Sequence, residues 1–144
     1  MRTSTLLRCV ALGMAAGVRS SWGLAGPVFT GAAGSGRRLA AAVAVAGETA
    51  ADKHPAVPDR LSAAGLAPRL LSGAAGAWVL ARRRSDPPAL PMMAAVAGVI
   101  AGSRAGVRWR AWAVDRVPDW QAALTEDAVA AVLALGACRR PSTG

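Results

Sequence analysis

The sequence predicts an all-α fold, a polytopic membrane helix bundle of four or five spans, on the strength of three observations. Hydrophobic residues make up 53% of the 144 residues and charged residues only 17%, a balance that is apolar for a soluble domain. The apolar residues form long Ala-dominated runs, without the alternation of period two that indicates strands. Basic residues stand in short clusters between these runs, as they do in loops that flank membrane spans.

Five apolar runs follow one another along the chain, divided by turn signals that contain Gly, Pro or Asp. They cover residues 6–18 with a continuation at 22–34, then 39–51, 63–81, 89–107 and 120–138. The last three approach the length of about 20 mainly apolar residues that a helix needs to cross the hydrocarbon core. Arg8 interrupts the first run, so an uncleaved span is predicted in preference to a signal peptide. We expect a single transmembrane helical domain at 1–138 and a basic disordered tail at 139–144.

Glycines recur every four residues in the fourth run, at Gly98, Gly102 and Gly106. This spacing puts them on one face of a helix, where a neighbouring helix can approach backbone to backbone. We therefore expect helix packing through these three residues. Gly13 and Gly17 form a shorter version in the first run, although chance in a Gly-rich chain explains that pair equally well.

The net charge of +9 comes almost wholly from arginine, which raises the alternative of a nucleic-acid-binding protein. The basic clusters lie between apolar runs, and no nucleic-acid-binding motif accompanies them. We expect the lipid bilayer as a partner and no nucleic acid. Cys9 and Cys138 have no second Cys or His at ligand spacing, so no metal and no cofactor is expected.

The second run ends in a dense polar segment. Glu48 and Asp52 are four residues apart and share one face of a helix. A carboxylate without a partner in hydrocarbon is costly. We therefore expect Glu48 to pair with a cation, and the candidates are Arg19 in the break of the first run, Arg69 and Arg60.

Ionisable residues also stand inside other apolar runs. For Arg19, which lies beside two serines, pairing is favoured over snorkelling to the interface. For Glu126 and Asp127, a packed intramembrane Arg is favoured as partner over a helical first turn made acidic by the helix dipole. His54 has no second metal ligand in view. The predicted polar or ion-binding site comprises Arg19, Glu48, Asp52, Lys53, Arg60, Arg69, Glu126 and Asp127.

A short repeated segment predicts an inverted repeat. The segment at 16–19 recurs at 105–108, and each copy is followed one run later by an acidic pair. In an alternating topology these two runs would cross the bilayer in opposite directions, while chance similarity is a nearly equal alternative. With five spans the basic residues divide evenly between the two sides. We favour the side of Arg37 and Arg82 as cytoplasmic, and the even split also allows insertion in both orientations as an antiparallel homodimer.

Several of these residues together resemble a known family. The pattern Glu48-x-x-x-Asp52-Lys53-x-Pro55-x-x-Pro58-x-Arg60, then Arg69-x-x-x-Gly73-Ala74, the glycines through Gly106, and Ala123-Leu124-x-Glu126-Asp127 stand in this order. They are similar to the bacterial membrane proteins of domain-of-unknown-function family 4126. The resemblance spans residues 12–135 and implies a polytopic membrane protein, with no assigned activity.

Three classes of function fit a multi-pass protein of the inner (plasma) membrane. The first is a small transporter or channel, in which the carboxylate/arginine site binds an unknown small ion or solute. The second is a structural or interaction protein, in which the same charges pair and fix helix register. The third and weakest is a lipid head-group enzyme with Asp52 as base and Arg60 as phosphate clamp. We expect no enzyme, because no nucleophile triad, metal cluster or phosphate loop is present in the sequence.

Overall fold

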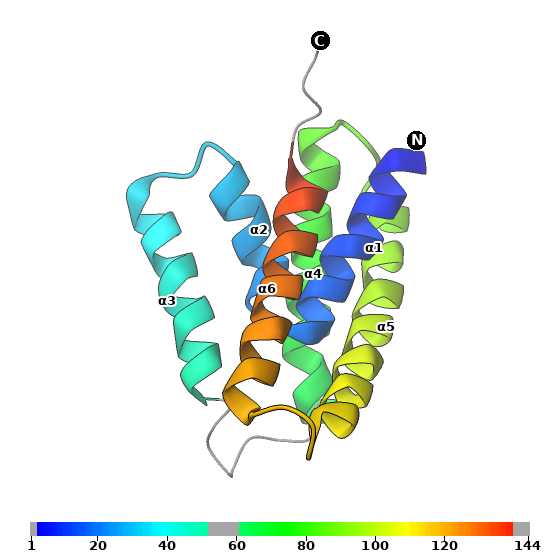
Figure 1. Cartoon of the computed structure of the whole chain (residues 1–144). Coiled ribbons are helices and arrows are strands. Elements are labelled where there is room, and N and C mark those ends of the chain that lie inside the picture. Colours follow the sequence, from blue (N-terminus) through cyan, green and yellow to red (C-terminus); the bar gives the residue numbers. More distant parts are fainter. Residues whose placement is uncertain (1–2, 52–60, 140–144) are drawn as a thin grey trace.

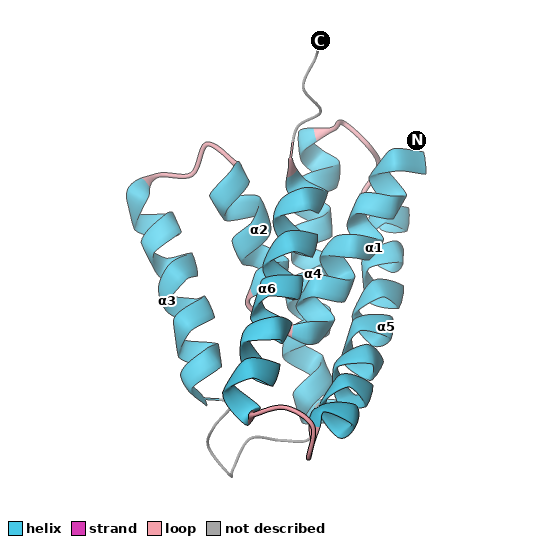
Figure 2. Cartoon of the chain, in the orientation of Figure 1, coloured by secondary structure: helices cyan, strands magenta, loops and turns pink. Residues whose placement is uncertain are grey.

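The computed structural model describes residues 3–51 and 61–139, and Figure 1 shows how their helices are arranged. In this described part all regular structure is helical, without strands, as predicted (Figure 2). The six helices are α1 (Thr3–Val18), α2 (Trp22–Thr30), α3 (Ser35–Ala51), α4 (Ala63–Arg83), α5 (Ala89–Ala113) and α6 (Asp119–Cys138). Residues 140–144 of the predicted tail lie outside the described residues.

The first apolar run does not form one span. It breaks at residues 19–21, and α2 turns back so that it ends at the same end of the bundle as the start of α1 (Figure 1). The break follows from the sequence Arg19-Ser20-Ser21, because polar side chains that bond to backbone groups favour turns over the interior of an apolar helix. The Trp22 amide then donates to the Arg19 carbonyl at 3.2 Å, which closes the turn.

α1 and α5 pack backbone to backbone through glycines from both helices. Gly13 faces Ala95, and four residues later Gly17 faces Val99. Residue numbers rise together along the contact, so α1 and α5 run in the same direction. The predicted inverted repeat is therefore wrong, since it required these two helices to be opposed. The turn at 19–21 is the physical reason, because it adds a reversal of direction that an uninterrupted first run would lack.

The three glycines of the predicted strip on α5 do not all have the same neighbours. Gly98 faces the Val10 carbonyl and Gly102 the Met14 carbonyl, both on α1, at a separation that leaves no room for a β-carbon. Gly106, one turn further, is buried and lines a pocket between α1, α5 and α6. Small residues at Gly98 and Gly102 thus allow the close approach of the two helices.

Two clusters of buried apolar side chains, many of them alanine, form the core around α1. One joins Leu12 and Val18 of α1 to Trp22 of α2 and to alanines of α6. The other joins Cys9 to Leu80 of α4 and Ala95 of α5. α3 lies at the edge and packs against α2, and none of its described residues is fully buried. Two of the described helices, α5 and α6, are long and apolar enough to cross a membrane, and α1 is a shorter apolar helix.

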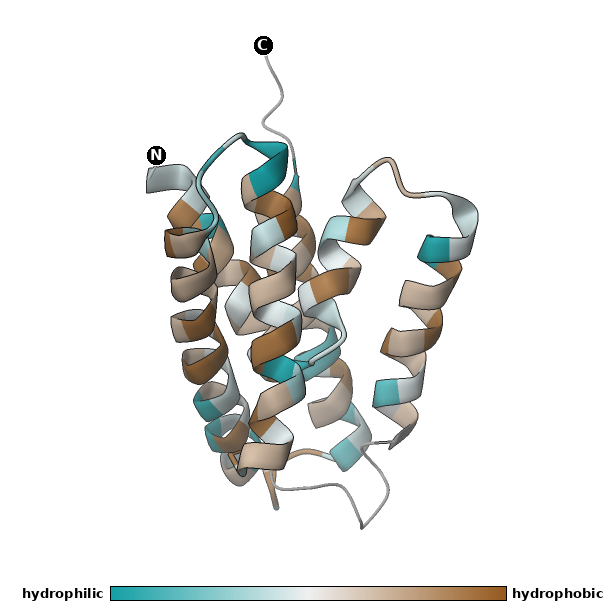
Figure 3. Ribbon diagram, turned by 180° about the vertical axis from the view of Figure 1, so that it is seen from behind, coloured by the Kyte–Doolittle hydropathy of each residue, from teal (hydrophilic) through white to brown (hydrophobic). Residues whose placement is uncertain are grey.

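The reversal at 19–21 gathers arginines at one end of the bundle. Arg8 of α1 donates to the Ala137 carbonyl of α6 at 3.1 Å, and Arg83 of α4 donates to the Pro27 carbonyl of α2 at 2.7 Å. The arginine-rich end, as we call it, carries Arg8, Arg37, Arg38, Arg82, Arg83, Arg84 and Arg139. Figure 3 shows hydrophilic residues at the ends of the helices and a hydrophilic patch within the bundle, near the turn between α1 and α2.

Candidate functional site

The candidate site is the turn between α1 and α2, which lies inside the bundle. A helix end leaves backbone carbonyls without intrahelical partners, and side chains from α4 and α5 satisfy those of the turn. Arg69 Nε and Ser103 Oγ both donate to the Gly17 carbonyl, each at 3.2 Å. Ser72 Oγ donates to the Ser20 carbonyl. Arg69 and Ser103 are buried, so these bonds replace solvent at the break.

Glu48 of α3 binds the start of α2 with both carboxylate oxygens. Its Oε1 accepts from the backbone nitrogen and Oγ of Ser20 at 2.7 and 2.8 Å. Its Oε2 accepts from the same two groups of Ser21 at 2.8 and 2.6 Å. Hydrogen bonds to an ionised acceptor are stronger than neutral ones, and the positive end of the α2 dipole favours the negative charge. In the described residues Glu48 is thus held by serines, whereas an arginine partner was predicted.

Arg19 pairs with the acidic group of a different helix. Its Nε lies 2.6 Å from Asp127 Oδ1 of α6. Arg19 is 2% exposed, and the Asp127 side chain is 24% exposed, so the pair is largely removed from solvent. Burial of two charges is costly unless they compensate each other. The predicted pairing of Arg19 is therefore present, with Asp127 in the place expected for Glu48.

A second charge cluster lies next to this one, where α5 and α6 approach each other. Arg110 binds Glu126 through two parallel bonds, Nε to Oε1 at 2.7 Å and Nη2 to Oε2 at 3.2 Å. Its Nη1 lies 3.1 Å from Asp119. Glu126 is 3% exposed, and the bidentate geometry suits a buried pair. Asp119, not Glu126, occupies the first turn of α6.

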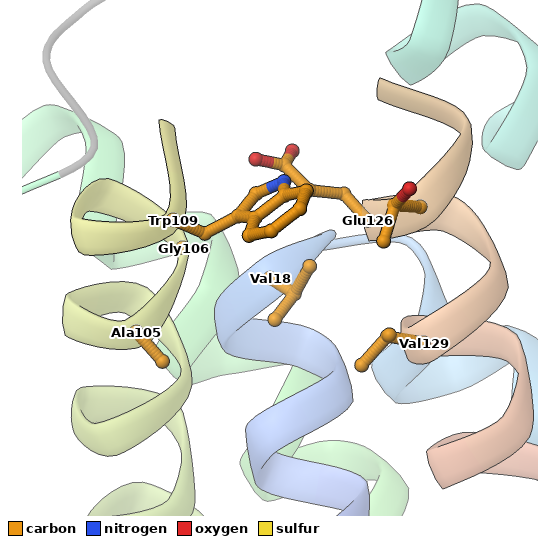
Figure 4. A pocket seen from close by; sticks show the side chains of 7 residues that line it. Val18, Ala105, Gly106, Trp109, Glu126 and Val129 are labelled. Carbon is orange, nitrogen blue, oxygen red and sulfur yellow. The ribbon is translucent and has the colours of Figure 1, made fainter. Parts of the chain in front are cut away.

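A pocket of about 320 Å³ opens between α1, α5 and α6 beside the Glu126 carboxylate. In Figure 4 the Trp109 ring and Glu126 lie at one end of it, with Val18, Ala105 and Val129 below them. Trp109 Nε1 donates to the Ala122 carbonyl at 3.3 Å, which fixes the ring across the gap between α5 and α6. The walls are almost wholly apolar, and Glu126 is already bound by Arg110.

The structure brings together four of the predicted site residues around the turn: Arg19, Glu48, Arg69 and Asp127. Glu126 belongs to the neighbouring cluster. The other three, Asp52, Lys53 and Arg60, lie outside the described residues, as does His54. Five polar residues of the two clusters were not predicted from the sequence: Ser20, Ser21, Ser72, Ser103 and Arg110.

A signal for two of the missed serines was present in the sequence. Ser72 follows Arg69 by three residues, so the two share one face of α4. Ser103 stands three residues before Gly106 of the glycine strip, so the two share one face of α5. No group of three His, Cys, Asp or Glu side chains within the described ranges is arranged to hold a metal ion.

Comparison with known proteins gives no family assignment. No family model matches the chain, and neither a curated protein sequence nor a solved structure matches it. The resemblance to domain-of-unknown-function family 4126 therefore stays a prediction.

Proposed function

We propose that the chain is a multi-pass protein of the bacterial inner (plasma) membrane that moves protons or small cations, with Glu48 as the ion-binding carboxylate. The observation that supports this proposal is that the Glu48 carboxylate binds the start of α2, at the break between α1 and the short helix α2. Broken helices that meet polar groups near the middle of the bilayer are the common architecture of ion and solute sites in transporters.

The proposed spans are α3, α4, α5 and α6, together with the re-entrant hairpin of α1 and α2. Irregular backbone is tolerated at membrane depth only where protein buries it or water lines it. The turn meets this condition, because the carbonyls of Gly17 and Ser20 accept hydrogen bonds from α4 and α5. The length and hydropathy of α5 and α6 support two of these spans.

Glu48 suits ion exchange better than the other buried acids do. Asp127 and Glu126 each lie beside an arginine, Arg19 and Arg110, which supplies a fixed positive charge at the carboxylate. The described partners of Glu48 are neutral serine groups that donate to it. A proton or cation that binds Glu48 therefore competes with hydrogen bonds instead of with a fixed positive charge. α3 packs at the edge of the bundle against α2, so its displacement would expose Glu48 without opening the core.

The arginine-rich end supports an orientation with this end in the cytoplasm. Positive residues in short loops favour the cytoplasmic side. The hairpin puts Arg8 at the same end of the bundle as the clusters at Arg37 and Arg82. The basic residues are therefore no longer divided evenly between the two sides, as they were with five spans. The proposed orientation puts the loop between α5 and α6 outside.

The test is ion flux in vesicles that contain the purified protein. Glu48→Gln keeps the size and one acceptor oxygen but removes the charge, and we expect it to abolish proton or cation movement. Asp115→Asn is the matched control, because Asp115 is an exposed carboxylate with φ of 66°, a conformation that Asn also adopts. Wild-type flux of protons and of every cation tested in Glu48→Gln vesicles would refute the proposal.

A structural role is the second candidate, and one observation favours it. Two arginine–carboxylate pairs join different elements, Arg19 to Asp127 and Arg110 to Glu126, as expected of charges that fix how helices align. For this role, Glu48→Gln would lower the melting temperature while the wild-type protein itself shows no flux above empty vesicles.

A further inference from the structure

A groove of about 490 Å³ runs between α2 and α3, separate from the charge pairs described above. Its walls are made by small and medium apolar side chains, Leu24, Ala25 and Val28 of α2 and Ala40, Ala41 and Ala44 of α3. This volume lies within the range of about 300–1,000 Å³ that is typical of small-molecule sites, which combine apolar walls with a few polar groups.

The two ends of the groove differ in charge. Ser20, Ser21 and Ser72 close the end that lies inside the bundle. Arg37, in the first turn of α3, lines the opposite end, which belongs to the arginine-rich end. The groove is therefore apolar along its length and cationic at its mouth, and its inner end is polar, closed by serines of which Ser20 and Ser21 also hold the Glu48 carboxylate.

Two further guanidinium groups lie near the mouth, where α2 ends. Arg38 Nη2 donates to the Gly31 carbonyl at 3.1 Å, and Arg83 Nη2 donates to the Pro27 carbonyl at 2.7 Å. In the described part of the chain each uses one N–H for these bonds, and a guanidinium has five. Both side chains are exposed, so donors remain for an anion at this end of α2.

We propose that this groove binds an anionic phospholipid, with one acyl chain between α2 and α3 and the phosphate among Arg37, Arg38 and Arg83. The apolar walls suit a hydrocarbon chain, and guanidinium groups match phosphate oxygens in geometry and charge. A zwitterionic lipid has the same kind of acyl chain, but the cationic group of its head group is repelled by the three arginines. The bound lipid fills the space between α3 and α2 and thereby holds α3 against the bundle.

The first experiment measures thermal unfolding of the full chain in a neutral detergent. Phosphatidylglycerol is compared with phosphatidylcholine that has the same acyl chains, and with glycerol phosphate, which has the head group alone. We expect phosphatidylglycerol to raise the Tm by about 3 °C or more, as a ligand of the folded state does, and the other two to have little effect. An equal shift with phosphatidylcholine, or the full shift with glycerol phosphate, overturns the proposal.

Two pairs of variants locate the site. Ala44→Phe fills the groove, and Ala42→Phe places the same ring on an exposed α3 position outside the groove lining. Arg37→Gln removes the cation at the mouth, and Arg116→Gln removes an exposed arginine in the loop after α5. We expect the lipid-dependent shift to be lost in Ala44→Phe and at least halved in Arg37→Gln, while both controls keep it. A full shift in Arg37→Gln overturns the proposal even if Ala44→Phe fails to fold. Lipid binding is measured without flux, so failure of the transport proposal leaves this result intact.

Discussion

The Glu48 carboxylate lies 2.8 Å from the backbone nitrogen of Ser21, across 27 residues of sequence. This bond and its three neighbours attach α3 to the start of α2. The contact is therefore both the structural link to the edge helix and the proposed ion site, and each of these roles predicts a different measurement.

Removal of the two hydroxyl donors should loosen α3. In the double variant Ser20→Ala, Ser21→Ala, the Glu48 carboxylate keeps its two backbone donors but loses both side-chain donors. At about 1.5–3 kcal/mol for each hydrogen bond to a charged group, we expect the loss of two such bonds to lower the unfolding free energy by roughly 3–6 kcal/mol, measured by denaturant titration in detergent. Ser4→Ala, at an exposed position of α1, is the control. Unchanged stability of the double variant would show that these bonds contribute little.

A methyl group at Gly102 should separate α1 from α5. The added β-carbon meets the backbone of Met14, which cannot move without shifting α1, and overpacking of this kind costs about 1–3 kcal/mol. Gly136→Ala is the matched control, because nothing lies within 4 Å of its β-carbon position in α6. Alanine there should stabilise the helix by roughly 0.5–1 kcal/mol. Melting temperatures that move in the same direction for both variants would contradict the close packing.

Neutralisation of Asp127 should leave the Arg19 charge poorly compensated. Breaking a buried ion pair on one side costs about 3–5 kcal/mol, and we expect Asp127→Asn to lie at the low end, since the Asp127 side chain is 24% exposed. The comparison is Asp115→Asn, an exposed carboxylate with the same change. The measurement is the unfolding free energy of each variant, and equal values for the two would show that Asp127 does not stabilise Arg19.

The proposed re-entrant hairpin predicts which loops lie on the same side of the membrane. Single cysteines at Ser4, Gly34 and Ser85, placed in a chain with Cys9 and Cys138 changed to Ala, should react with a membrane-impermeant maleimide from one side, and a cysteine at Asp115 from the other. A first run that crossed the bilayer once would put Ser4 and Gly34 on opposite sides. Labelling of these two positions from opposite sides would thus contradict the hairpin.

The helical character of the chain was predictable because it depends on local sequence. Ala-rich runs without alternation favour helices wherever they lie, and the boundaries at 63, 89 and 138 agree with α4, α5 and α6. The reversal at Arg19 was not predictable in the same way. Its stability comes from residues such as Arg69 and Ser103, which lie far along the chain. No local sequence pattern distinguishes a kink within one continuous helix from a hairpin whose second helix runs back toward the start of the first.

Charge partners were harder to predict than the charged residues themselves. Burial cost identifies Arg19, Glu48 and Glu126 as residues that need compensation, and the structure supplies it in every case. The choice of partner depends on helix direction and rotation. Once the first run is a hairpin, α6 faces Arg19 with Asp127, and Glu48 meets the serines that follow Arg19.

The hairpin of α1 and α2 also has a consequence for the order in which the helices pack during synthesis. The hairpin precedes α3 to α6 in the sequence, so the ribosome makes it before the side chains that hold its turn. In the proposed membrane arrangement, the carbonyls of Gly17 and Ser20 and the charge of Arg19 would at first lack these later side chains, and unsatisfied polar groups are costly in lipid. We therefore expect the hairpin to reach its final packing only after α3 to α6 are in place, although it is made before them.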